Sequence, residues 1–241
     1  MYGWRGKIGQ IVPAAGSPTT EGEFRRLLPE GVILVNTLVP TQEISKEELS
    51  TRYNENIENA ARLLAMAEVD IIVQGGTPVA QYVEGNEEAI ERRIRAVTGI
   101  PAVATITCVI NALRKMGIRK LAIGAPYPVK VTEDLATLLK KRGFDVVATK
   151  SLNIRRNIDI TKLSPADAYR LGKQAFLQAQ DCDGLLLSCG AMPMLDIVEK
   201  LEFDIEKPVV ATYTAIAWEC LRRLGIREPI KGYGKLMLSF D

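Results

Sequence analysis

Runs of apolar, β-branched residues recur along the chain and alternate with segments whose apolar residues repeat every three or four positions. Several of the runs are continuously apolar, which is typical of parallel strands that are buried on both faces of a sheet. The pattern predicts eight strands, at Ile8–Val12, Val32–Val35, Ile71–Gln74, Ala102–Ala104, Leu121–Gly124, Val146–Thr149, Leu185–Ser188 and Val209–Ala211. Two intervening segments predict amphipathic helices, over Leu49–Ala67 and Ala166–Ala179. This alternation indicates an α/β fold with right-handed crossovers.

The two halves of the chain resemble each other. Three blocks recur in the same order, KIGQIVP at 7–13 with KLAIGAP at 120–126, DIIVQGGT at 70–77 with DGLLLSCG at 183–190, and LRKMGIR at 113–119 with LRRLGIR at 221–227. They predict two pseudo-symmetric four-stranded parallel-sheet α/β units, the first from residues 1–115 plus 216–241 and the second from 116–215. The alternative is the general likeness of all α/β units.

The repeat predicts where function lies. Ligands of parallel sheets bind beyond the carboxyl ends of the strands, and two units related by a pseudo-two-fold axis bring those ends together. Four strand-end loops are therefore expected to converge on an active site between the units: Pro13–Pro18, Gly75–Pro78, Pro126–Pro128 and Ser188–Met192. All four carry glycine, proline or small residues, which let backbone N–H groups approach a ligand.

The composition narrows the chemistry. None of the 241 residues is histidine, which excludes Ser-His-Asp and Cys-His triads and HExxH zinc sites. A net charge of +2, without a basic run, argues against a nucleic-acid partner. No apolar stretch reaches the roughly 18 residues of a membrane span, and no signal peptide is recognisable at the start. Four cysteines without a CxxC pair predict free thiols and a cytoplasmic protein.

Motifs for cofactors are missing as well. The first predicted strand leads into Pro13-Ala14-Ala15-Gly16, which is no GxGxxG fingerprint, and the sequence contains no GxxxxGK[ST] loop. No acidic cluster resembles a metal cage. We therefore expect neither a cofactor nor a metal, and proton chemistry must depend on Cys, Tyr, Lys, Asp or Glu.

Cys189 is the first candidate for that chemistry. It follows a predicted strand and precedes Gly190 and a helix expected from about Met192. Backbone N–H groups are free at such a turn, and a thiol there can act as acid, base or nucleophile. The alternative is a small buried apolar residue, which is the expectation for Cys108, Cys182 and Cys220.

The repeat partner of Cys189 is Gly76, so only one of the two equivalent positions carries a thiol. This asymmetry predicts protonation of a substrate carbon from one side, although Gly76 also suits a tight turn with positive φ. Thr77 offers a hydroxyl and an N–H to an oxyanion, or serves as a helix cap. Tyr127 lies between two prolines that hold its backbone, or is a surface aromatic.

These residues resemble the aspartate/glutamate racemase superfamily, and within it the arylmalonate decarboxylases, with the maleate cis-trans isomerases as further relatives. The resemblance covers nearly the whole chain, and its motifs are DGLLLSCG at 183–190, the Gly76-Thr77 turn, Tyr127, the Val12–Gly16 loop and GYGKL at 232–236. Racemases and isomerases of the superfamily have a cysteine in both halves. The decarboxylases have glycine at the first position, as here.

The resemblance implies a cofactor-independent decarboxylase of a disubstituted malonate. Cys189 becomes the proton donor, and the oxyanion donors are Thr77, Tyr127 and the N–H groups of Cys189 and Gly190. Gly76 and Pro13 line the site, and Asn157 resembles an asparagine that binds a substrate carboxylate in maleate isomerases.

The chain also departs from the decarboxylase pattern. Pro78 replaces a serine donor, and the segments 41–43 and 155–157 are more polar, which predicts a smaller or more polar dicarboxylate. The alternatives are an isomerase or racemase acting on a small dicarboxylate, and a non-catalytic binding module. The sequence leaves the choice between a monomer and a homodimer open.

Overall fold

The computed structural model describes residues 2–240, whose eight strands form two parallel sheets. The strands are β1 (Gly6–Pro13), β2 (Val32–Val39), β3 (Ile71–Gln74), β4 (Ala102–Ala104), β5 (Lys120–Ala125), β6 (Asp145–Ser151), β7 (Gly184–Leu187) and β8 (Val209–Ala211). The strand orders are β2-β1-β3-β4 and β6-β5-β7-β8. All eight predicted strands are thus confirmed, and the two four-stranded α/β units have the same topology.

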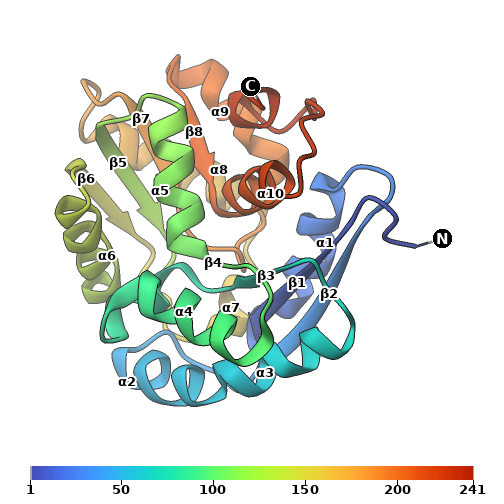
Figure 1. The fold of residues 1–241 in the computed structure, drawn as a ribbon. Helices are drawn as coiled ribbons and strands as arrows, with labels where there is room; N and C mark the ends of the chain where they lie inside the picture. Colours follow the sequence, from blue (N-terminus) through green and yellow to red (C-terminus); the bar gives the residue numbers. More distant parts are fainter. Residues whose placement is uncertain (1, 241) are drawn as a thin grey trace.

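The helices connect successive strands and cover the sheets (Figure 1). They are α1 (Ser17–Glu23), α2 (Lys46–Glu48), α3 (Asn54–Met66), α4 (Asn86–Thr98), α5 (Thr105–Lys115), α6 (Val129–Lys141), α7 (Asn157–Ile160), α8 (Pro165–Leu177), α9 (Val198–Ile205) and α10 (Thr212–Arg223). Of the two predicted helices, the first is α3 preceded by a π-helical turn, and the second is α8. Helices α5 and α10 follow the last strand of each sheet and pack against each other.

Equivalent positions of the repeat make equivalent contacts. The Lys7 N–H donates to the Asp70 carboxylate at 2.7 Å, and the Lys120 N–H donates to the Asp183 carboxylate at the same distance. Each aspartate returns its own N–H to the carbonyl of the same lysine, which fixes the start of the third strand of each unit against the first. The sequence blocks that predicted the repeat are therefore also equivalent in three dimensions.

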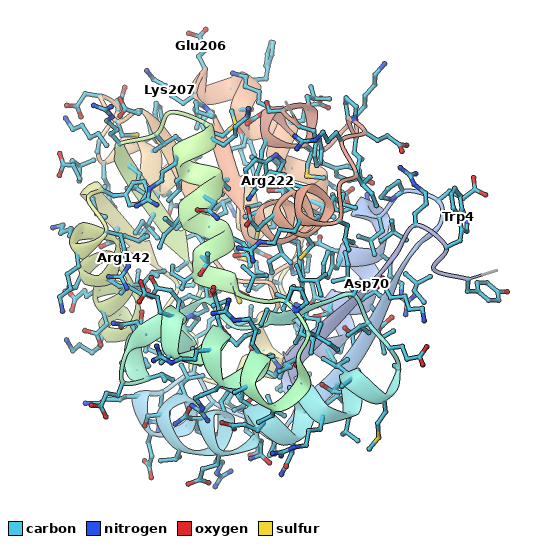
Figure 2. All side chains as sticks on the ribbon, in the orientation of Figure 1. Trp4, Asp70, Arg142, Glu206, Lys207 and Arg222 are labelled. Atoms are coloured by element: carbon cyan, nitrogen blue, oxygen red, sulfur yellow. The ribbon has the colours of Figure 1, made fainter. Side chains whose placement is uncertain are left out.

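The segment after α10 contacts both units. Glu228 forms an ion pair with Arg5 at 2.9 Å, and the Lys235 N–H donates to Glu202 of α9. The division at residues 115 and 215 stays a prediction. Within residues 2–240, no helix has the length and apolar character needed to cross a membrane. Figure 2 shows Trp4 at the margin of the molecule, where its side chain is 64% exposed.

Candidate active site

The four strand-end loops meet at one cavity between the two units, as predicted. Its volume is about 50 Å³. The loops contribute to its wall the residues Pro13, Gly16, Gly75, Gly76, Pro78, Tyr127, Cys189, Gly190 and Ala191. The strand ends thus bring together five of the seven predicted site residues, namely Pro13, Gly76, Tyr127, Cys189 and Gly190. The sixth, Asn157, reaches the same wall from α7.

Cys189 lies two residues after the end of β7 and is buried, with 4% of its surface exposed. Its φ angle is +149°, a backbone conformation that residues other than glycine rarely adopt and that is found most often at functional sites. Its N–H donates to the Thr212 hydroxyl at 2.9 Å. The prediction that this N–H is free to bind an oxyanion is therefore wrong, because Thr212 at the start of α10 occupies it.

The helix after Cys189 begins later than predicted. Met192 precedes Pro193, and proline disfavours helical backbone in the residue before it. The chain makes a short 3₁₀ turn over Leu195–Ile197 before α9 begins at Val198. The thiol therefore does not lie in the first turn of a helix, where the helix dipole would lower its pKa.

Burial instead raises the pKa of the Cys189 thiol to about 11. Hydrogen bonds from the N–H groups of Ala191 and Met192 and from the Tyr127 side chain oppose this effect but do not cancel it. At neutral pH the side chain is consequently a protonated thiol, which is the form that can give a proton to a carbanion.

The turn at Gly76 faces the same cavity from the first unit. Gly76 has φ +93°, and a Cβ there would lie 3.0 Å from the Val79 side chain. Its neighbour Gly75 needs to be glycine for another reason, because a Cβ would lie 2.4 Å from the Ile11 carbonyl oxygen. The two positions that the repeat makes equivalent, Gly76 and Cys189, both have positive φ.

Tyr127 and Thr77 are the candidate side-chain donors. Tyr127 is 2% exposed, and its hydroxyl lies 3.3 Å from the Ser188 hydroxyl. Burial raises the pKa of this phenol well above its usual value, so the hydroxyl stays protonated. Thr77 is buried and its side chain lowers the pKa of Tyr127, which places it beside that phenol, but Thr77 is not among the residues that line the cavity.

Asn157 begins α7 and is 6% exposed. Its N–H donates to the Gln42 carbonyl at 2.9 Å, and next to it Glu43 pairs with Arg155 at 2.7 Å across the two units. The side-chain amide of Asn157 has no hydrogen bond to another described residue and lies beside Gly16. It is therefore free to bind a ligand.

A sequence model of the family described as arylmalonate decarboxylase matches residues 8–237. The chain belongs to the arylmalonate decarboxylase family. Arylmalonate decarboxylase of Bordetella bronchiseptica is 29% identical over 95% of each chain, and a maleate isomerase of Pseudomonas putida is 27% identical over 96% of each. One similar solved structure is the liganded form of an arylmalonate decarboxylase mutant with one glycine-to-cysteine and one cysteine-to-serine change. It superposes on this chain with a TM-score of 0.88 at 27% identity, and the superposition covers 96% of this chain and 98% of that one.

The sequence reasoning missed a polar cluster in the cavity of this arylmalonate decarboxylase family member. Gln10 of β1 is 2% exposed, and its side-chain oxygen has no hydrogen-bond partner within the described residues. The Thr20 and Tyr213 hydroxyls share a short hydrogen bond, and all three side chains line the cavity. A glutamine inside the apolar run Ile8–Val12 was a usable sign of this cluster, whereas nothing in the sequence marks Tyr213.

The cavity wall holds no cation. Among the described residues that line it, the one charged side chain is Glu43, which Arg155 neutralises. Arg155 is not among the residues that line the cavity, and its guanidinium donates to Glu43. No group of three or more Cys, Asp or Glu residues in the described part of the chain could hold a metal ion. Any anion in this family member must therefore be bound by neutral donors.

Glu23 is a second buried titratable group near the site. It lies at the end of α1 in the first unit and is 6% exposed. One carboxylate oxygen accepts hydrogen bonds from the N–H groups of Met194 and Leu195 in the second unit, at 2.8 and 3.1 Å. Burial raises the pKa of Glu23 to about 7, against the opposing effect of these two hydrogen bonds.

A Glu23→Gln variant is expected to be more stable than the wild type above pH 7. Because the folded-state pKa is raised from 4.5 to about 7, the folded protein favours the protonated carboxyl. The stability that this preference gives below pH 4.5 is lost as pH rises through about 7, and the loss is up to about 3 kcal/mol at roughly 1.4 kcal/mol per pKa unit. Urea unfolding should show the gain at pH 8 and a much smaller one at pH 5. Equal gains at both pH values would contradict this origin.

Proposed function

We propose that this protein is a cofactor-independent decarboxylase of a small, disubstituted malonate-type dicarboxylate, and that Cys189 protonates the product carbanion from one face. The observation that carries the proposal is a protonated thiol in a cavity whose wall also contains Gly76, the repeat partner of Cys189. Cys189 is the one cysteine among the described lining residues, so a bound carbon has a thiol donor on one side and a bare glycine on the other.

In the proposed reaction, the bond between the central carbon and one carboxylate breaks, and carbon dioxide leaves. The electron pair of that bond moves into the remaining carboxylate as an enediolate. The Cys189 thiol then gives its proton to the central carbon, and the resulting thiolate recovers a proton from solvent. The net change consumes one proton, releases one carbon dioxide and leaves a monocarboxylate with a single new C–H bond.

The enediolate needs hydrogen-bond donors because its negative charge develops on the retained carboxylate. Tyr127 and Gly190 both line the cavity. The Tyr127 hydroxyl lies next to the Cys189 thiol and 3.3 Å from the Ser188 hydroxyl, so it is placed beside the proposed proton donor. Donors that are already in place when charge develops commonly contribute about 3–4 kcal/mol each. The free amide of Asn157 suits a carboxylate on the opposite wall.

The cavity favours a small substrate over an aryl-substituted one. The cavity volume of about 50 Å³ is small, which suits the compact group of atoms around a malonate better than one that also carries a phenyl ring. Gln10, Thr20 and Tyr213 make one wall polar, and Gln10 presents an unpartnered acceptor. We infer that the substituents on the central carbon are small and that one of them carries a hydrogen-bond donor such as a hydroxyl group.

Incubation with a dicarboxylate panel in deuterated water tests the proposal. The panel contains methylmalonate, a hydroxymethyl-substituted methylmalonate, phenylmalonate, maleate and aspartate, and NMR follows every product together with released carbon dioxide. We expect decarboxylation with one deuterium at the central carbon, and faster turnover of the small malonates than of phenylmalonate. A lack of carbon dioxide release from every malonate would overturn the proposal.

The alternative is isomerisation of a small dicarboxylate such as maleate, which the free amide of Asn157 and the likeness to maleate isomerases support. An isomerase that adds a thiolate to a double bond needs the deprotonated form of Cys189. Since the pKa of that thiol is raised to about 11, such a rate would climb with pH across the range from 7 to 10. A thiol that acts as acid gives no such climb, so the pH profile separates the two reactions.

A further inference from the structure

Three side chains of the first unit bind the segment that follows Cys189 in the second unit. Thr19, Glu23 and Arg26 are spaced four and three residues apart along the helical stretch of α1 and the 3₁₀ turn Phe24–Leu27, which places them on one face. The Thr19 hydroxyl donates to the Ala191 carbonyl at 2.8 Å. Glu23 accepts from two N–H groups at residues 194 and 195, and Arg26 pairs with Asp196.

The segment that these side chains bind, residues 191–196, lies next to the Cys189 thiol. The Met192 N–H donates to the Cys189 carbonyl at 3.2 Å, and the N–H groups of Ala191 and Met192 both lower the pKa of the thiol. The carbonyl of the same Ala191 residue is the acceptor of Thr19. A single residue, Ala191, therefore links the Thr19 hydroxyl to the Cys189 thiol.

The segment needs this support because its own hydrogen bonding is sparse. The helix that follows starts only at Val198, and Cys189 has the unfavourable φ angle of +149°. Backbone strain of this kind persists only where the surrounding structure holds it. Contacts from another element are therefore required between Cys189 and α9.

We propose that Thr19 and Glu23 are positioning residues, which hold the segment 191–195 against the first unit and thereby orient the Cys189 thiol toward the cavity. The inference rests on the proposed role of Cys189 as proton donor. Thr19 is 7% exposed and Glu23 is 6% exposed, so water does not compete for their hydrogen bonds. Arg26 is 42% exposed at its side chain and Asp196 is 54% exposed, so this ion pair contributes little.

Hydrogen exchange measured by mass spectrometry on the full-length protein tests the contacts directly. Glu23→Leu removes the acceptor and is expected to speed exchange of the peptide containing residues 191–196 by roughly tenfold or more, whereas Glu23→Gln keeps an acceptor oxygen and the protection. Thr19→Val is nearly isosteric and provides a second test in case Glu23→Leu does not fold. It should also speed exchange of the same peptide, whereas Thr19→Ser keeps the hydroxyl and should exchange at the wild-type rate. Arg26→Gln is the matched control from the same face and should leave exchange unchanged.

Steady-state kinetics of the same variants on the best malonate test the positioning role. Thr19→Val and Glu23→Leu should lower kcat several-fold with little change in KM, and Thr19→Ser and Glu23→Gln should restore kcat. Unchanged exchange in both Thr19→Val and Glu23→Leu overturns the proposal, as does faster exchange with unchanged kcat. If the wild type turns over no malonate, the proposed function fails, and the exchange data still decide whether the two residues hold the segment.

Discussion

Replacing Cys189 with alanine is expected to lower the rate of carbon dioxide release about 10²- to 10⁴-fold, because a positioned general acid contributes a factor of this size. The thiol is buried, protonated and within the cavity wall, and no second cysteine lines that wall in residues 2–240. The loss should be in kcat, since alanine leaves the donors for the retained carboxylate in place. Stopped assays with radiolabelled malonate carboxyl groups measure it.

Cys182→Ala is the matched control for this substitution. Cys182 is equally buried but precedes β7 at the other end of the strand, outside the cavity. Its replacement should cost some stability through lost packing and leave kcat close to that of the wild type. Carbon dioxide release that survives in Cys189→Ala would show that another group supplies the proton.

Replacing Tyr127 with phenylalanine should lower kcat about 10²- to 10³-fold, the usual effect of removing one donor to a developing oxyanion. The ring is fully packed and the change removes one oxygen atom, so the fold should be retained. Because burial raises the pKa of the phenol, its hydroxyl stays a donor at every pH at which the protein is assayed. The loss should therefore be the same at pH 6 and pH 9.

Tyr169→Phe provides the comparison, since the Tyr169 hydroxyl donates to Asp204 on the exposed surface. That change should leave turnover unaffected. A Tyr127→Phe variant with wild-type kcat would exclude Tyr127 from the oxyanion hole and leave the Gly190 N–H and Asn157 as the remaining donors in the cavity.

The eight strands and the location of the cavity were predictable because buried parallel strands appear as continuous apolar runs, and because the matched blocks fix which turns are equivalent. The seven site residues came from those turns and from the family resemblance. What failed depended on contacts between distant segments. The N–H of Cys189 is occupied by Thr212, whose nearness follows from the packing of α10 and not from any local motif.

Glu23 illustrates the same limit. In sequence it sits between glycine and phenylalanine in a charged helical stretch, where a solvent-exposed carboxylate is the ordinary expectation. It is buried because backbone N–H groups 171 and 172 residues further along fold against it. The late start of α9, in contrast, was predictable from the sequence. Pro193 disfavours helical backbone at Met192, the residue before it.

The positive φ angles of Gly76 and Cys189 have an evolutionary consequence. Both positions have positive φ, which glycine adopts freely and cysteine adopts only at a cost in free energy. A chain selected for stability alone would carry glycine in both turns. The first unit has glycine at this position, and the second has cysteine. The backbone at position 189 favours glycine, so selection must act on the thiol to keep cysteine there.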